Sequence, residues 1–165
     1  MNVKNLLFFA IIVSLFACNK EEDEKATINY YMTSNKSRTY DHVMFRFDYT
    51  RVIYSHNDRE SVVELLPQNI ILDLDRPSEI YLGSSPAEPG EIKGYSFQIS
   101  DVKVVKDGDT IALDQPYQYD DYTEFSLNPA KGDIMNINFV LDVDGSTILD
   151  TITGNHWISP KIAVE

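Results

Sequence analysis

The sequence contains a single cysteine, Cys18, so no disulfide can form within the chain. Positive charge is also scarce: 14 lysines and arginines stand against 26 aspartates and glutamates, and the formal net charge is −12 at pH 7. Because nucleic-acid binding requires a basic surface, this balance excludes nucleic acid as an expected partner. The one long hydrophobic run, residues 6–17, is shorter than the roughly 20 residues that a membrane-spanning helix needs.

The sequence also has few of the patterns that mark catalytic and metal sites. It has no Gly-x-Ser-x-Gly nucleophile elbow and no glycine-rich phosphate-binding loop. His42, His56 and His156 lack the spacing of a shared metal site. A Ser-His-Asp triad can assemble from distant residues, so spacing alone leaves that alternative open. We expect a protein that is not an enzyme and needs no cofactor.

The N-terminal segment has the organisation of an export signal. A short basic region with Lys4 precedes the apolar run, which ends directly before Cys18. Residues 15–18, Leu-Phe-Ala-Cys, resemble the lipobox of bacterial lipoproteins. This resemblance implies that residues 1–17 form a lipoprotein signal peptide and that Cys18 becomes a lipidated N-terminus. Several acyl chains anchor a protein stably to a membrane.

Other functions for Cys18 are disfavoured by its surroundings. A zinc site needs several converging ligands, and the nearest histidine in the sequence is His42. A nucleophilic thiolate needs a nearby base, whereas Cys18 precedes a cluster of acids.

Residues 18–26 are expected to form the lipidated cysteine and an acidic tether. Residues 19–25, Asn-Lys-Glu-Glu-Asp-Glu-Lys, are densely charged and contain no apolar side chain that could anchor them to a core. Acids directly after a lipidated cysteine resemble the surface-export signal of Bacteroidota lipoproteins. The resemblance implies an outer-membrane protein that is anchored by lipid and faces the medium.

Residues 27–165 are expected to form a single all-β domain without a substantial helix. Apolar residues occupy every odd position from 135 to 143, a period of two that is typical of a strand with one buried face. Residues 43–49 follow the same pattern. Further strands are expected at 28–32, 62–66, 70–74, 80–82, 95–105, 110–113, 123–127 and 157–164. Frequent turn signals, including Asp107-Gly108 and Ser84-Ser85-Pro86, favour an antiparallel β-sandwich of about 8–10 strands.

Two of these strands change phase along their length. Phe45, Phe47 and Tyr49 alternate, and then Val52 and Tyr54 continue on the other parity. The strand from residue 95 shows the same shift after residue 99. Because a one-residue shift turns later side chains to the wrong face, we expect β-bulges near residues 50–51 and 100–101.

The order of these segments resembles the bacterial lipoprotein family known as domain of unknown function four-three-eight-two. The resemblance begins at residues 32–36 and 40–52 and resumes at residues 89–95, Pro-Gly-Glu-Ile-Lys-Gly-Tyr. It ends with residues 139–148 and 157–162. The family resemblance implies an anchored lipoprotein with a β-sandwich, for which a transthyretin-like strand arrangement is one alternative. It implies no established activity.

Three sets of residues are candidate sites. Tyr117, Tyr119 and Tyr122 lie in a polar segment and could contact a glycan or a protein, or could cover the end of the sandwich. Two Asp-Thr-aliphatic triplets, at Thr110 and Thr151, resemble O-glycosylation acceptors of Bacteroidota. Asp142 and Asp144 are weak calcium candidates, because the residues that follow do not keep the EF-hand spacing.

Three hypotheses of function remain. The first is an outer-membrane lipoprotein whose β-sandwich binds a glycan or a protein without catalysis. The second is a structural or accessory subunit of an envelope assembly, with the sandwich as a docking module. The third, an enzyme, has no identifiable catalytic residues.

Overall fold

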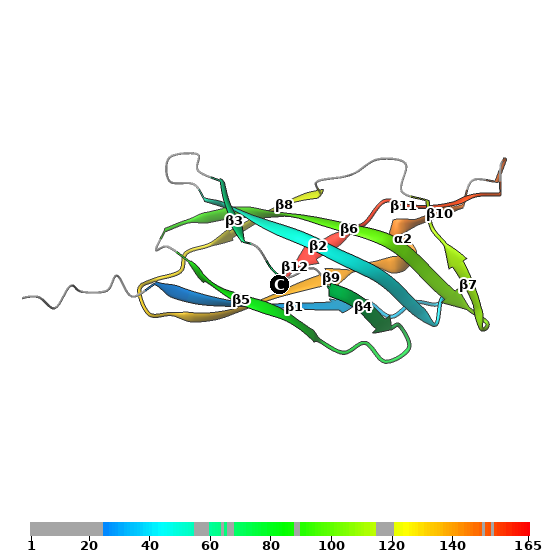
Figure 1. Cartoon of the computed structure of the whole chain (residues 1–165), viewed down its shortest axis with the longest axis horizontal. Coiled ribbons are helices and arrows are strands. Elements are labelled where there is room, and N and C mark those ends of the chain that lie inside the picture. Colours follow the sequence, from blue (N-terminus) through cyan, green and yellow to red (C-terminus); the bar gives the residue numbers. More distant parts are fainter. Residues whose placement is uncertain are drawn as a thin grey trace, which may run out of the picture.

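The fold is all-β, as the sequence predicts. The computed structural model describes residues 25–54, 60–63, 65, 68–87, 90–114, 121–149, 151–152 and 154–165. These residues form twelve strands and one short helix: β1 (Ala26–Ser34), β2 (His42–Tyr54), β3 (Glu60–Val63), β4 (Gln68–Asp73), β5 (Ile80–Ala87), β6 (Ile92–Lys106), β7 (Asp109–Ala112), β8 (Asp121–Leu127), β9 (Ile134–Leu141), α2 (Val143–Ser146), β10 (Thr147–Leu149), β11 (His156–Ile158) and β12 (Ile162–Val164). They are arranged as a sandwich (Figure 1). Among them, no helix is long and apolar enough to cross a membrane.

The first sheet has the strand order β12-β9-β1-β5. β1 pairs antiparallel with β5 but parallel with β9, from Thr27 opposite Ile134 to Ser34 opposite Leu141. The predicted sandwich is confirmed, but its first sheet contains the parallel pair β1–β9 beside its antiparallel pairs. Parallel neighbours need a long crossover, and here the chain between β1 and β9 passes through the second sheet.

The second sheet is built on the two long strands β2 and β6, which pair antiparallel with each other. On its other edge β2 pairs with β4 and then with β3, whereas β6 pairs with β7 and β8. A small ribbon of β10 and β11 lies beside this sheet, and a bridge between Asp114 and Trp157 ties it to the chain after β7.

The predicted bulge in β6 is confirmed. Pairing moves from Met44–Lys103 to Arg46–Ser100, so β6 holds one extra residue there, and Asp101 has a φ of +51°. The corresponding bulge in β2 falls between Phe47 and Tyr49, slightly before the predicted position. Phe47 and Thr50 in β2, and Ile99 and Val102 in β6, are buried on either side of the shifts, so the bulges allow these long strands to keep one buried face.

Beyond shifts of a few residues at strand ends, the strands depart from the sequence prediction in four places. Residues 157–164 form two strands rather than one, because Pro160 lies between them and has no N–H for a ladder. β10 was not expected, and the strand predicted to reach residue 143 ends at Leu141, where α2 follows. Ser84, Ser85 and Pro86 lie inside β5 rather than in a turn. Because β5 is an edge strand, it tolerates a proline.

Three fully buried aromatic rings join the two sheets. Tyr30 of β1 and Phe139 of β9 stack with a centroid separation of 6.2 Å. Tyr95 of β6 meets both rings edge to face, at 6.1 Å from Tyr30 and 5.6 Å from Phe139. The core therefore lies between the sheets, with the longest strands contributing its largest side chains.

Both ends of the sandwich can be located from β1. The strand starts at Ala26, the last residue of the segment expected to be a tether, and its nine residues span about 30 Å at the usual rise of a strand. Where β1 ends, three connections gather: β1–β2, β4–β5 and the β6–β7 turn (Figure 1). This end is called the loop end below.

Candidate functional site

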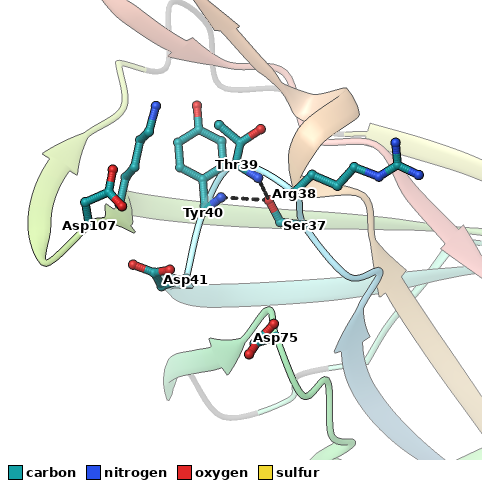
Figure 2. A pocket seen from close by; sticks show the side chains of 8 residues that line it. Ser37, Arg38, Thr39, Tyr40, Asp41, Asp75 and Asp107 are labelled. Carbon is teal, nitrogen blue, oxygen red and sulfur yellow. Dashed lines mark hydrogen bonds between the residues drawn. The ribbon is translucent and has the colours of Figure 1, made fainter.

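An open cleft of about 520 Å³ lies at the loop end of the sandwich. Its lining residues come from three connections: Ser37, Arg38, Thr39, Tyr40 and Asp41 from β1–β2, Asp75 from β4–β5, and Lys106 and Asp107 from the end of β6 and the turn into β7 (Figure 2). We call it the loop cleft. Segments distant in the sequence meet here because β2 pairs with both β4 and β6 near His42.

The β6–β7 side of the cleft is a two-residue turn. Asp107 and Gly108 have φ values of +51° and +87°, and Lys106 pairs with Asp109. Two successive positive φ angles are typical of a type I′ hairpin turn, which confirms the prediction from the Asp-Gly pair.

The β1–β2 side of the cleft is a turn organised by Ser37. Its Oγ accepts hydrogen bonds from the backbone N–H groups of Thr39, at 3.0 Å, and Tyr40, at 2.9 Å (Figure 2). The same hydroxyl donates to Oδ1 of Asp144 at 2.5 Å, and the Arg38 N–H donates to Oδ2 of Asp144 at 3.0 Å. Burial acts to raise the pKa of Asp144, but the hydrogen bonds from Ser37, Arg38 and Thr39 outweigh it, and the pKa is lowered.

The β4–β5 side is organised by another carboxylate. Oδ1 of Asp73 accepts the N–H groups of Asp75, at 2.9 Å, and Arg76, at 3.0 Å. The hydrogen bonds from Arg76 and Asp75 lower the pKa of Asp73. Both turns therefore depend on an ionised aspartate that accepts hydrogen bonds from the turn.

Backbone hydrogen bonds join the connections to one another. Leu74 N–H donates to the carbonyl of Asp41 at 2.9 Å, and Ser37 N–H donates to the carbonyl of Leu74 at 3.3 Å. Asp41 N–H donates to the carbonyl of Val105 at 2.8 Å. The cleft is therefore held in shape by links to β2, β4 and β6 before any ligand arrives.

The cleft presents unpaired charges to solvent. Within the described part of the chain, the exposed carboxylates of Asp41, Asp75 and Asp107 have no hydrogen-bond or ion-pair partner, and neither does the ammonium group of Lys106. The Arg38 side chain extends to the far side of its loop from Asp107 (Figure 2). Tyr40 is half-buried and packs against the core.

This arrangement suits a small polar ligand. Carboxylate oxygens accept hydrogen bonds from hydroxyl or amine groups, and a tyrosine ring offers an apolar face with a polar tip. Among the described residues, no group of three or more histidine, cysteine, aspartate or glutamate side chains has the geometry of a metal site.

Several sites predicted from the sequence cannot be placed in this geometry. Cys18, Tyr117 and Tyr119 lie outside the described residues. Tyr122 lies in β8, opposite Ser96, and its side chain is not among the described ones.

The remaining predicted residues are placed. Thr110 in β7 and Thr151 in the turn after β10 are both exposed. Asp142 caps α2 by accepting the N–H of Gly145 at 2.9 Å, whereas Asp144 accepts from Ser37 and Arg38. Each carboxylate is therefore engaged with a different part of the chain, and both have structural roles.

Sequence reasoning did not identify the loop cleft. The Asp107-Gly108 turn was recognised as a hairpin, but nothing in the sequence places it near Tyr40 or Asp75. Their proximity follows from the strand order, which local patterns do not encode. A sequence signal existed only for the separate turns.

A second exposed feature is apolar. The β10–β11 ribbon and the turn after β10 carry Ile148, Leu149, Ile152 and Trp157, which are 52%, 53%, 93% and 36% exposed. Ile148 lies directly opposite Trp157 in the ribbon. Successive side chains of a strand point to opposite faces, so Leu149 does not share the face of Ile148 and Trp157. We call Ile148 and Trp157 the ribbon patch. Clustered exposed apolar residues are typical of protein contact sites.

Comparison with known proteins gives little guidance. No family model and no curated protein matches the chain. A solved structure, described as the NMR structure of the protein from Eubacterium rectale, matches with a TM-score of 0.27 and 10% identity, covering 86% of this chain and 92% of the other. This similarity is too weak to support a statement about fold or function.

Proposed function

We propose that the protein is an outer-membrane lipoprotein, anchored through Cys18 and facing the medium, whose β-sandwich binds a glycan in the loop cleft. The observation that carries this proposal is the position of the cleft. It lies at the end of β1 opposite the tether, so an anchored molecule presents it away from the membrane. The resemblance to the family of domain of unknown function four-three-eight-two agrees with an anchored β-sandwich.

The lining of the cleft supports a sugar ligand. Asp41, Asp75 and Asp107 supply acceptors for hydroxyl groups, Lys106 supplies a donor, and Tyr40 supplies a ring. The acidic lining and the net charge of −12 disfavour anionic polysaccharides. We therefore expect neutral or amine-bearing sugars to bind.

The binding proposal is tested by titrating purified protein with glucosamine, N-acetylglucosamine and galacturonate oligosaccharides. Tyr40→Ala is expected to weaken binding about tenfold or more, as truncation of an aromatic anchor commonly does. Tyr81→Ala is the matched control, because Tyr81 is 53% exposed and is not part of the cleft lining. Absence of binding to neutral and amine-bearing sugars contradicts the proposal.

The anchoring proposal has a separate test. Cys18→Ala is expected to abolish labelling of the protein by radioactive palmitate and to release it from the membrane fraction. On intact cells, added protease is expected to degrade the wild-type protein if it faces the medium. Unchanged palmitate labelling in Cys18→Ala contradicts the lipobox assignment, and full protection from protease contradicts surface exposure.

The ribbon patch favours the second candidate function, a docking module of an envelope assembly. Exposed apolar side chains lose water contact when a partner covers them, and tryptophan is common in such contacts. Crosslinking on intact cells tests this candidate. Trp157→Ser and Ile148→Ser are expected to abolish capture of one specific envelope protein; capture that is unchanged in both variants contradicts a role of the patch.

A further inference from the structure

Asp144 contacts the cleft turn from another part of the fold. It lies in α2, directly after β9, and Ser37 is 107 residues away in sequence. It is not part of the lining of the loop cleft. Nevertheless, both of its carboxylate oxygens accept hydrogen bonds from the turn that forms one side of that cleft, Oδ1 from the Ser37 hydroxyl and Oδ2 from the Arg38 N–H.

The contact with Asp144 fixes the orientation of the Ser37 hydroxyl group. A hydroxyl has one proton and two lone pairs. The Ser37 proton goes to Asp144, which leaves the lone pairs of Oγ for the N–H groups of Thr39 and Tyr40. Without the acceptor at Asp144, the Ser37 hydroxyl is free to rotate. The backbone of Thr39 and Tyr40, which line the cleft, is then held less firmly.

α2 in turn is attached to the C-terminal strands. The Ser146 hydroxyl donates to the carbonyl of Asp142 and accepts the N–H of Lys161 at 2.8 Å. The N–H of Ser159 donates to the Ser146 carbonyl at 2.9 Å. Asp144 therefore projects from a base that is fixed to β9 and to the segment before β12, rather than from a free loop.

From these contacts, we infer that Asp144 is a positioning residue for the loop cleft, which sets the conformation of the Ser37–Tyr40 turn and so controls glycan binding without touching the ligand. This inference rests on the proposed function of the cleft. It assigns a role to a carboxylate for which the sequence offered only a weak calcium assignment.

The decisive variant is Asp144→Asn, which keeps the size of the side chain. An amide has one oxygen and one NH₂ group, but the Ser37 O–H and the Arg38 N–H converge on the two oxygens of Asp144, and Thr39 also donates to this carboxylate. One donor must then face another donor. Asp133→Asn is the matched control, because Asp133 accepts the N–H of Ala130 at 2.8 Å in a different turn and lies outside the cleft lining.

Two readouts separate this inference from the proposed function. Amide hydrogen exchange, which needs no ligand, is expected to accelerate about tenfold or more at Arg38, Thr39 and Tyr40 in Asp144→Asn, since hydrogen bonds to charged groups are the stronger ones. Titration with a glucosamine oligosaccharide is expected to show about tenfold weaker binding in the same variant. Asp133→Asn is expected to leave both readouts at the wild-type level.

A double-mutant cycle with Ser37→Ala tests the route of the effect. Because Asp144 acts through Ser37, the two substitutions are expected not to add. The variant with both Ser37→Ala and Asp144→Asn should have about the same affinity for the oligosaccharide as the single variant with the lower affinity. Unchanged exchange at Thr39 and Tyr40 in Asp144→Asn overturns the inference, whether or not sugars bind. Strictly additive losses of affinity overturn the route through Ser37. Failure of the wild-type protein to bind any sugar overturns the proposed function, and the exchange readout still decides whether Asp144 holds the turn.

Discussion

Replacement of Phe139 by alanine is expected to remove the ring that joins the two sheets. Phe139 is fully buried in β9, stacks on Tyr30 in the same sheet and contacts Tyr95 of the opposite sheet edge to face at 5.6 Å. Truncation of a buried phenylalanine costs about 3–5 kcal/mol, through lost burial and the cavity left behind. Each ring pair contributes about 0.5–1.5 kcal/mol beyond its buried area, which places Phe139→Ala towards the upper part of that range.

Urea denaturation followed by circular dichroism measures the effect on the free energy of unfolding. A domain is typically stable by about 5–15 kcal/mol, so Phe139→Ala removes a large share of the total. Tyr81→Ala serves as the control, because Tyr81 also pairs with a ring, that of Tyr31 at 5.4 Å, but is 53% exposed. A loss in Phe139→Ala no larger than in Tyr81→Ala would refute the packing between the sheets described above.

Three further expectations concern local features. Gly108→Ala is expected to destabilise the protein by about 1 kcal/mol, because the φ of +87° disfavours a side chain. Asp101→Gly is expected to stabilise it by up to about 1 kcal/mol, because Asp101 has a φ of +51°. Urea denaturation measures both changes in the free energy of unfolding, and changes of the opposite sign refute the turn and bulge geometry. The lowered pKa of Asp73 stabilises the folded protein above the unfolded pKa of 3.8, and this contribution is lost as pH falls through the lower folded pKa. Asp73→Asn is therefore expected to be less stable than wild type at about pH 6 and equally stable at about pH 2. A stability difference that persists at about pH 2 would refute this expectation. If Thr110 or Thr151, both exposed, is glycosylated, mass spectrometry of protein purified from its native cells should show a mass above that of the polypeptide. Thr110→Ala or Thr151→Ala should remove this excess mass, and a mass equal to that of the unmodified polypeptide refutes the expectation.

Much of the fold was predictable because local patterns determine it. Alternation with a period of two located most strands, and the phase shift after Ile99 predicted the bulge at Asp101. Turn-forming residues gave a wrong prediction at Ser84, Ser85 and Pro86, which lie in a strand. They are tolerated there because β5 is at the edge of its sheet. The parallel pairing of β1 with β9 left no local trace, since both parallel and antiparallel strands alternate in the same way.

The candidate site was far less predictable. Ser37 and Arg38, which donate hydrogen bonds to Asp144, lie 107 and 106 residues away in sequence. The sequence therefore marked Asp144 only as a weak calcium candidate, whereas its role depends on tertiary contacts. Tyr40 and Asp75 carry no motif, and only the pairing of β2 with β4 and β6 brings their loops together. Sites assembled from several connections require the strand order before they can be recognised.

The central position of β1 has a mechanical consequence. β1 is hydrogen-bonded on both edges, to β9 and to β5, and it is the strand that follows the proposed tether. A pull on the proposed ligand at the loop end, opposed by the proposed membrane anchor, would act along this strand and load both ladders in shear. Many hydrogen bonds then share the load at once instead of opening one after another. A surface protein built in this way resists extraction or unfolding by flow better than one whose tether leads to an edge strand.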